Sequence, residues 1–161
     1  MSVNNSIKSS GAFVEDDKDV VYLSGPVRCV EDDGRKWRGK VIERYRSTFE
    51  FRSPLDRFDP NEHEILRNPE NLDESSDRRQ VLPCEYVLED KVLITESDYI
   101  LVGLPESIAR GTMMECMWGF CVEDTPFFVW TIDGQEESGW IYHHSEFMSD
   151  DLDEVMKEIE R

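Results

Sequence analysis

Three acidic residues stand near the ends of predicted strands, where a side chain could do chemistry: Asp56, Asp98 and Glu115. Glu115 lies about one turn into a predicted helix that begins at Gly111, on a face otherwise formed by Met114, Met117 and Trp118. Burying a carboxylate on such an apolar face costs free energy unless the group is paired or has a function. Carboxylates act as nucleophiles at the anomeric carbon of sugars, with a second acid handling the proton. The pattern therefore favours a catalytic Glu115, with a satisfied buried carboxylate or an exposed one as alternatives.

The elements that must position these acids follow from the apolar pattern. Four short apolar runs predict strands at residues 20–23, 49–51, 99–102 and 127–130, and a short fifth strand follows a loop at 138–140. Helical spacing predicts helices at 35–46, 84–94 and 111–122, and from about 150 to the end of the chain. The strands are nearly continuous apolar runs, which is typical of parallel strands covered on both faces. The sequence thus predicts a doubly wound α/β fold, flavodoxin- or Rossmann-like, with a mostly parallel five-stranded sheet and helices on both faces.

The length of 161 residues predicts one domain with a sizeable core. We expect a flexible tail over residues 1–18 and a folded domain over 19–161. Within that domain, residues 57–81 are polar and predict a long loop, a lid or a disordered insertion. In doubly wound sheets the site lies beyond the carboxyl ends of the strands. Those ends are the segments 24–26, 53–56, 103–105 and 131–133.

The charge balance excludes some classes of function. The chain has 36 acidic and 18 basic residues, a net charge of −18, which disfavours a nucleic-acid polymer or an anionic membrane as partner. An acidic coat of this density indicates a protein of high-salt cells, such as halophilic archaea or their viruses, with ordinary solubility as the alternative and a DNA mimic disfavoured. No apolar run is long enough to span a membrane, and the polar start does not resemble a secretory signal, so we expect a cytoplasmic protein.

Metal and cofactor motifs are not found in the sequence. The four cysteines lack C-x-x-C spacing. His143 and His144 have no third ligand at metal spacing, and in a strand their side chains would point to opposite faces. The sequence also lacks a G-x-G-x-x-G motif and a P-loop, so we expect no metal and no cofactor.

Several ordered pieces of the chain resemble the nucleoside 2-deoxyribosyltransferase family. They are YLSGP at residues 22–26, PLD at 54–56, Asp90 followed by SDYI at 97–100, and GTMME at 111–115. Each piece alone is weak, but their order and spacing together are similar to the family over most of residues 20–133. The last piece resembles the G-T-x-x-E element that carries the family's nucleophilic glutamate.

The resemblance implies a reaction and a set of site residues. Glu115 would attack C1′ of a 2′-deoxynucleoside and expel the base, and another base or water would resolve the covalent deoxyribosyl intermediate. Asp98 would hydrogen-bond the base and manage its proton, and Tyr22 would position Glu115 or the sugar. Substrate-binding candidates are Ser24, Gly25, Pro26, Asp56, Asp90, Arg110, Gly111, Thr112 and Ser138. The partners implied are a deoxynucleoside or deoxynucleotide and a free nucleobase. The resemblance, together with the aromatic residues near the C-terminus, also implies a homo-oligomer, a dimer or larger.

Some residues depart from the family pattern and keep alternatives open. Ala109 stands where several relatives carry an Asp that contacts the sugar or a Ser that contacts a 5′-phosphate, and the neighbouring Arg110 could grip such a phosphate. The alternatives are a deoxynucleoside 5′-monophosphate N-glycosidase acting by hydrolysis, an N-glycosidase of another nucleotide such as NAD, and a non-catalytic nucleotide-binding module of the same fold. The residues leave open the choice between transfer and hydrolysis and the preferred base.

Overall fold

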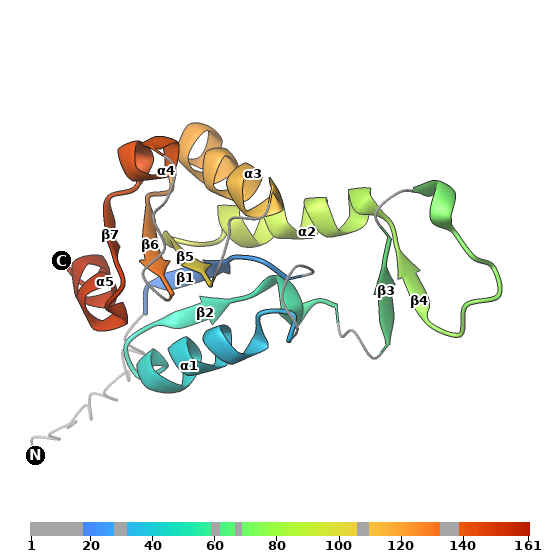
Figure 1. Ribbon diagram of the computed structural model, residues 1–161, viewed down its shortest axis with the longest axis horizontal. Coiled ribbons are helices and arrows are strands. Elements are labelled where there is room, and N and C mark those ends of the chain that lie inside the picture. The colour runs from blue at the N-terminus through green and yellow to red at the C-terminus, as the bar shows by residue number, and fades with distance from the viewer. Residues whose placement is uncertain (1–17, 28–31, 59–61, 67–68, 106–109, 133–138) are drawn as a thin grey trace, which may run out of the picture.

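A five-stranded, all-parallel sheet forms the centre of the domain. The computed structural model describes residues 18–27, 32–58, 62–66, 69–105, 110–132 and 139–161 (Figure 1). The strands lie in the order β2-β1-β5-β6-β7. Their bounds are β1 (Val20–Ser24), β2 (Glu50–Arg52), β5 (Tyr99–Leu104), β6 (Phe127–Thr131) and β7 (Phe147–Ser149). In the central pair of β1 and β5, Val21 lies opposite Tyr99 and Ser24 opposite Val102.

Helices cover both faces of this sheet. One face carries α1 (Arg35–Tyr45) and α5 (Leu152–Ile159), and the other carries α2 (Pro83–Thr95), α3 (Arg110–Trp118) and α4 (Gly139–His144) (Figure 1). The predicted doubly wound α/β fold with a five-stranded sheet is therefore confirmed.

Alternation along β1 divides the core into two layers. Val21 and Leu23 pack with the layer of α1 and α5, whereas Tyr22 packs with the layer of α2 and α3. All three side chains are fully buried. Because alternate side chains of a strand point to opposite faces, Ser24 shares the face of Tyr22. The two polar side chains of β1 therefore lie on the side from which α2 and α3 approach.

The strand order fixes where a ligand site is expected. The chain runs from β1 outward to β2, and then returns past β1 to β5 and continues to β6 and β7. The direction of winding therefore reverses between β1 and β5. In open α/β sheets ligands bind at this switch point, outside the carboxyl ends of the two strands.

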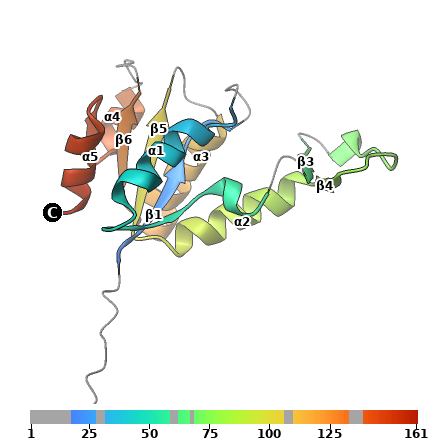
Figure 2. The ribbon, with the colours of Figure 1, turned by 90° about the horizontal axis from the view of Figure 1, so that it is seen from below.

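The segment 57–81 forms a small arm with secondary structure of its own, which the prediction of a long loop missed. It contains a two-stranded parallel sheet of β3 (His63–Ile65) and β4 (Arg79–Val81), and the arm projects from the body beside the start of α2 (Figures 1 and 2). A short 3-10 turn (Pro54–Asp56) precedes it, and another (Pro69–Asn71) lies between its strands. Phe58, Leu66 and Val81 are buried. Three apolar side chains spaced this widely leave no periodic signal in a polar segment.

The region after β6 and the end of α3 also differ from the sequence prediction. Residues 139–144 form the short helix α4, not a loop, so the imidazoles of His143 and His144 do not alternate as in a strand. The His144 ring stacks on Trp140, one helical turn earlier, with ring centroids 5.5 Å apart. Helix α3 ends at Trp118 and continues as a π-helical turn (Gly119–Glu123).

Of the predicted tail, residues 1–17 lie outside the described residues.

Candidate functional site

Ser24 and Glu115 meet at the switch point of the sheet. Ser24 is the last residue of β1, and its hydroxyl donates a short hydrogen bond to Oε2 of Glu115 on α3. Ser24 is fully buried and Glu115 is partly buried, so the bond forms with little competition from water. A hydrogen bond to a carboxylate stabilises its ionised form and restricts its orientation. The hydrogen bond therefore holds one oxygen of Glu115 in place.

Tyr22 and Asp90 complete a cluster of titratable groups around Glu115. Tyr22 lies two residues before Ser24 on β1, and Asp90 lies on the face of α2 that approaches it. The Tyr22 hydroxyl is fully buried and forms no hydrogen bond of acceptable geometry within the described parts of the chain, although Asp90 is near enough for each group to affect the pKa of the other. A buried hydroxyl without a partner is costly.

The electrostatics of the cluster separate the roles of its two carboxyls. Burial raises the pKa of Glu115, while the Ser24 hydrogen bond and the charge of Arg38 oppose that rise. Burial, followed by the charge of Glu115, raises the pKa of Asp90 to about 7. Close carboxyls of this kind share one proton near neutral pH. The Ser24 hydrogen bond favours the ionised form of Glu115, and the raised pKa of Asp90 allows that carboxyl to hold a proton near neutral pH. Burial raises the pKa of Tyr22 well above its ordinary value, so its hydroxyl stays neutral.

Two glycines beside the cluster allow close packing of an indole. A Cβ atom added to Gly25 would lie 2.6 Å from the carbonyl oxygen of Gly103 and 2.7 Å from Cζ2 of Trp37. A Cβ atom on Gly103 would lie 2.7 Å from the same indole. The ring of Trp37 thus packs against the ends of β1 and β5 where any larger residue would collide. This contact ties α1 to the two strands that carry the site.

The structure does not bring Asp98 to Glu115, which corrects the role expected for it. Asp98 precedes β5 and is exposed at the amino ends of the strands, opposite the edge that holds Ser24. Its Oδ2 accepts a hydrogen bond of 2.8 Å from the backbone N–H of Val20. Because parallel strands place their amino and carboxyl ends at opposite edges, Asp98 binds the backbone at the amino end of β1, away from the site. Asp90 lies beside Glu115 in its place.

Asp56 also has a local role in the structure. Its carboxylate accepts a hydrogen bond from the N–H of Ser53 within the 3-10 turn after β2, and its side chain is exposed. No contact between Asp56 and the cluster appears among the described residues.

The other substrate-binding candidates take different places. Gly25 and Pro26 are buried directly after β1, and Thr112 is buried in the first turn of α3. Arg110 and Gly111 are exposed at the start of α3, where a Cβ atom added to Gly111 would meet no described atom within 4 Å. Ser138, like Ser107 and Ala109, lies outside the described residues.

Within the described ranges no group of three or more His, Cys, Asp or Glu side chains could hold a metal ion. In the same ranges no helix combines the length and the apolar character needed to cross a bilayer.

Arg38, whose charge lowers the pKa of both Glu115 and Asp90, was not predicted as a site residue from the sequence. It follows Trp37 on α1 and is 2% exposed. The sequence signal for it is its place beside the apolar stripe of that helix, which indicates burial. A buried arginine is rare unless its donors are satisfied.

Comparison with known proteins supports the fold and does not extend to function. No family model and no curated protein matches the chain. The structure is similar to a crystal structure of a conserved protein from Enterococcus faecalis V583, with a TM-score of 0.53, 14% sequence identity and 87% of each chain covered. At this identity the similarity shows the α/β fold alone.

Proposed function

We propose that the protein cleaves the N-glycosidic bond of 2′-deoxynucleosides through a covalent deoxyribosyl-Glu115 intermediate and transfers the sugar to another base. One observation carries the proposal: Ser24 fixes a partly buried Glu115 at the switch point of the sheet, beside Asp90, whose pKa is raised to about 7. An ionised carboxylate next to a carboxylic acid is the pair needed for substitution at an anomeric carbon. The resemblance of residues 22–26 and 111–115 to the deoxyribosyltransferase family supports the choice of substrate.

In the first step Glu115 forms a bond to C1′ while the bond from C1′ to the base nitrogen breaks. The base leaves with the electron pair and takes the proton held by Asp90, since Asp90 titrates near neutral pH. The negative charge of Glu115 stabilises the oxocarbenium-like transition state. The buried Tyr22 hydroxyl donates to the sugar or to Glu115, which satisfies its unpaired donor.

In the second step a nitrogen of the acceptor base attacks C1′ and Glu115 departs as a carboxylate. Asp90, now ionised, accepts the proton of the incoming base. If water attacks in place of a base, the same residues carry out hydrolysis. Whether transfer or hydrolysis prevails depends on how well the site excludes water.

The test is to separate products by chromatography after incubation in molar KCl. The protein is given each deoxynucleoside, each deoxynucleoside monophosphate and NAD, with and without a free acceptor base. We expect a new deoxynucleoside that appears only with the acceptor, and loss of turnover by at least about 10³-fold in Glu115→Gln. Glu96→Gln, which removes an exposed carboxylate at the end of α2, is the matched control and keeps activity. Free base with deoxyribose would indicate hydrolysis. No conversion of any substrate by a folded protein would favour the non-catalytic binding module.

A 5′-monophosphate is a second candidate substrate because Arg110 is exposed at the start of α3, five residues before Glu115. In that case Arg110→Ala raises KM for the monophosphate at least about tenfold and leaves KM for the nucleoside unchanged. Equal effects on both substrates would argue against a phosphate contact.

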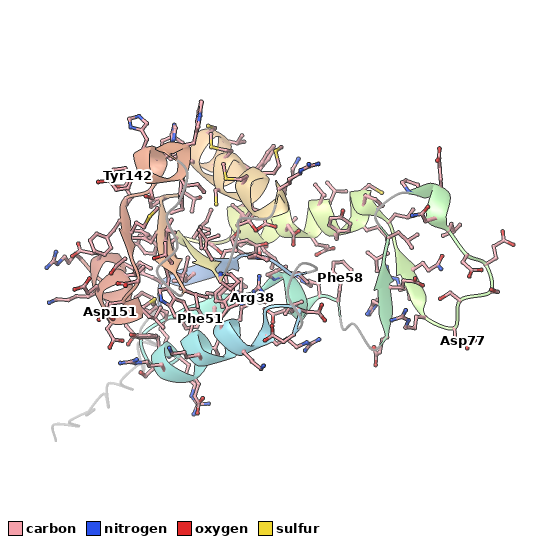
Figure 3. The ribbon with its side chains drawn as sticks, in the orientation of Figure 1. Arg38, Phe51, Phe58, Asp77, Tyr142 and Asp151 are labelled. Carbon is pink, nitrogen blue, oxygen red and sulfur yellow. The ribbon has the colours of Figure 1, made fainter. Side chains whose placement is uncertain are left out.

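We also propose that the protein is a homo-oligomer. Large apolar side chains are exposed on the two helices that supply Asp90 and Glu115: Leu88 at 61%, Val92 at 44% and Met114 at 71%. Trp140 and Tyr142 on α4 are exposed as well, and Figure 3 labels Tyr142. A second copy that covers α2 and α3 would remove this surface from water and further enclose the site.

A further inference from the structure

Arg38 is a buried cation that donates hydrogen bonds to backbone carbonyl oxygens. Figure 3 shows it in the interior of the domain, between α1 and the sheet. Its guanidinium donates to five carbonyl oxygens, those of Leu23, Gly25, Pro26, Asp33 and Gly34, at 2.8–3.4 Å. No described residue forms an ion pair with Arg38. The retention of an unpaired charge in the core requires a reason, because burial of a cation is costly.

Two of these bonds enclose Ser24. Nε of Arg38 donates to Leu23 at 3.2 Å, and Nη2 donates to Gly25 at 2.8 Å. The guanidinium thus holds the peptide units on both sides of the serine whose hydroxyl fixes Glu115. A guanidinium is planar and presents five N–H donors in a fixed geometry, whereas an ammonium has three donors around one nitrogen. Lysine can therefore supply the charge at this position but cannot hold both carbonyls.

We propose that Arg38 is a positioning residue for Glu115, acting through Ser24. The guanidinium fixes the end of β1, the fixed backbone aims the Ser24 hydroxyl, and the hydroxyl holds the carboxylate in its ionised form and in line with the substrate. The part of the inference that concerns turnover rests on the proposed function. The part that concerns the state of Glu115 stands on the hydrogen bonds alone.

Other groups also act on the titration of Glu115 and must be considered in any test. They come from each element packed around it: Tyr22 on β1, Arg38 on α1, Asp90 on α2 and the neighbouring thiol of Cys116 on α3. Glu89 on α2 acts on Asp90. Burial lowers the pKa of Arg38 only to about 10, so the guanidinium stays charged wherever the carboxyls titrate. Arg38→Lys therefore tests the planar donor geometry of the guanidinium.

The experiment is a double-mutant cycle of Arg38→Lys and Ser24→Ala. Its readout is the side-chain carboxyl titration of Glu115 in ¹³C-glutamate-labelled protein, assigned with Glu115→Gln. Loss of the serine bond in Ser24→Ala raises the pKa of Glu115, by about 0.5–1 pH unit. We expect Arg38→Lys to reproduce most of that rise, and the double variant to add nothing further. Arg44→Lys is the matched control, because Arg44 is exposed on the same helix and pairs with Asp153. Titration and turnover are measured where thermal unfolding shows each variant to be folded.

In the active protein we expect Arg38→Lys to lower kcat about 10–100-fold with KM changed less than threefold, because misalignment of a reacting group acts on the transition state. An unchanged Glu115 titration in folded Arg38→Lys, or additive effects of the two changes, would overturn the proposal. If the wild-type protein turns over no substrate, the proposed function fails, yet the titration cycle still decides the role of Arg38. If Arg38→Lys does not fold, Arg38→Gln, which retains donors to one carbonyl, takes its place in the cycle.

Discussion

Replacement of Asp90 by asparagine is expected to stabilise the protein at alkaline pH while abolishing its turnover. Asp90 lies on α2 beside Glu115, and burial raises its pKa to about 7 from an ordinary value of 3.8. The folded state therefore binds this proton more tightly than the unfolded state does. The stability that comes from the protonated carboxyl is fully present below pH 3.8 and is lost as the pH rises through about 7.

The size of the effect follows from linkage. A pKa raised from 3.8 to about 7 corresponds to a loss of roughly 4 kcal/mol on going from full protonation to full ionisation. About 2–3 kcal/mol of that loss lies between pH 5 and pH 8. Asparagine resembles the protonated acid and does not ionise. The free energy of unfolding of Asp90→Asn should therefore exceed that of the wild type by about 2–3 kcal/mol more at pH 8 than at pH 5.

The assay is urea unfolding of both proteins at half-unit steps from pH 5 to pH 8.5, in a fixed concentration of KCl. Glu96→Gln removes one negative charge from an exposed position near the end of α2, and so corrects for the change in net charge. Its difference from the wild type should stay nearly constant with pH. If the advantage of Asp90→Asn also stayed constant to within about 0.5 kcal/mol, Asp90 would not hold a proton in the folded protein and the assigned acid role would be refuted.

Three further predictions concern residues outside the acid pair. Asp98→Asn should keep kcat within about twofold in the product assay, because asparagine still accepts the strand-end hydrogen bond, and a 100-fold loss would restore Asp98 as the proton-handling acid. Gly25→Ala should lower the free energy of unfolding by at least about 2 kcal/mol, since its Cβ would collide with Trp37 and a backbone carbonyl. Gly111→Ala, with open space around it, should raise the free energy of unfolding by up to about 1 kcal/mol. Equal urea midpoints for the two variants would contradict the packing. Leu88→Glu should convert the oligomer to the 18.9 kDa monomer in light scattering, and a wild-type protein that already elutes as a monomer would disprove the proposed assembly.

Much of the fold could be predicted because its core strands are continuous apolar runs. The predicted strand at 99–102 lies within β5, and that at 127–130 within β6, because length and burial on both faces leave few alternatives. The arm was missed because β3 and β4 have three residues each, two of which are polar in either strand. The helix α4 was missed because its six residues carry only one fully buried side chain, Ile141.

Some residues of the site could likewise be predicted from the sequence, and others could not. Tyr22, Ser24 and Glu115 stand in the segments that resemble the deoxyribosyltransferase family, and the structure places the three side chains together. Asp98 appeared suitable because it adjoins a buried strand, but sequence adjacency to a strand does not tell which edge of the sheet a residue occupies. Arg38 carries no motif, since its partners are backbone carbonyls that every residue possesses.

The central position of β1 has a consequence for how the chain is made. Ser24 can form its hydrogen bond only after Glu115, 91 residues later, has been synthesised. β1 can pair with β5 only after residues 99–102 have been synthesised. At a synthesis rate of roughly 5–20 residues per second, the growing chain holds β1 without its β5 partner for about 5–20 s. The face of β1 that bears Tyr22, fully buried in the finished domain, lacks its covering helix α3 during this interval. The nascent chain thus passes through a period in which one edge of β1 is open to chaperones or to other chains, and the site is assembled only when that period ends.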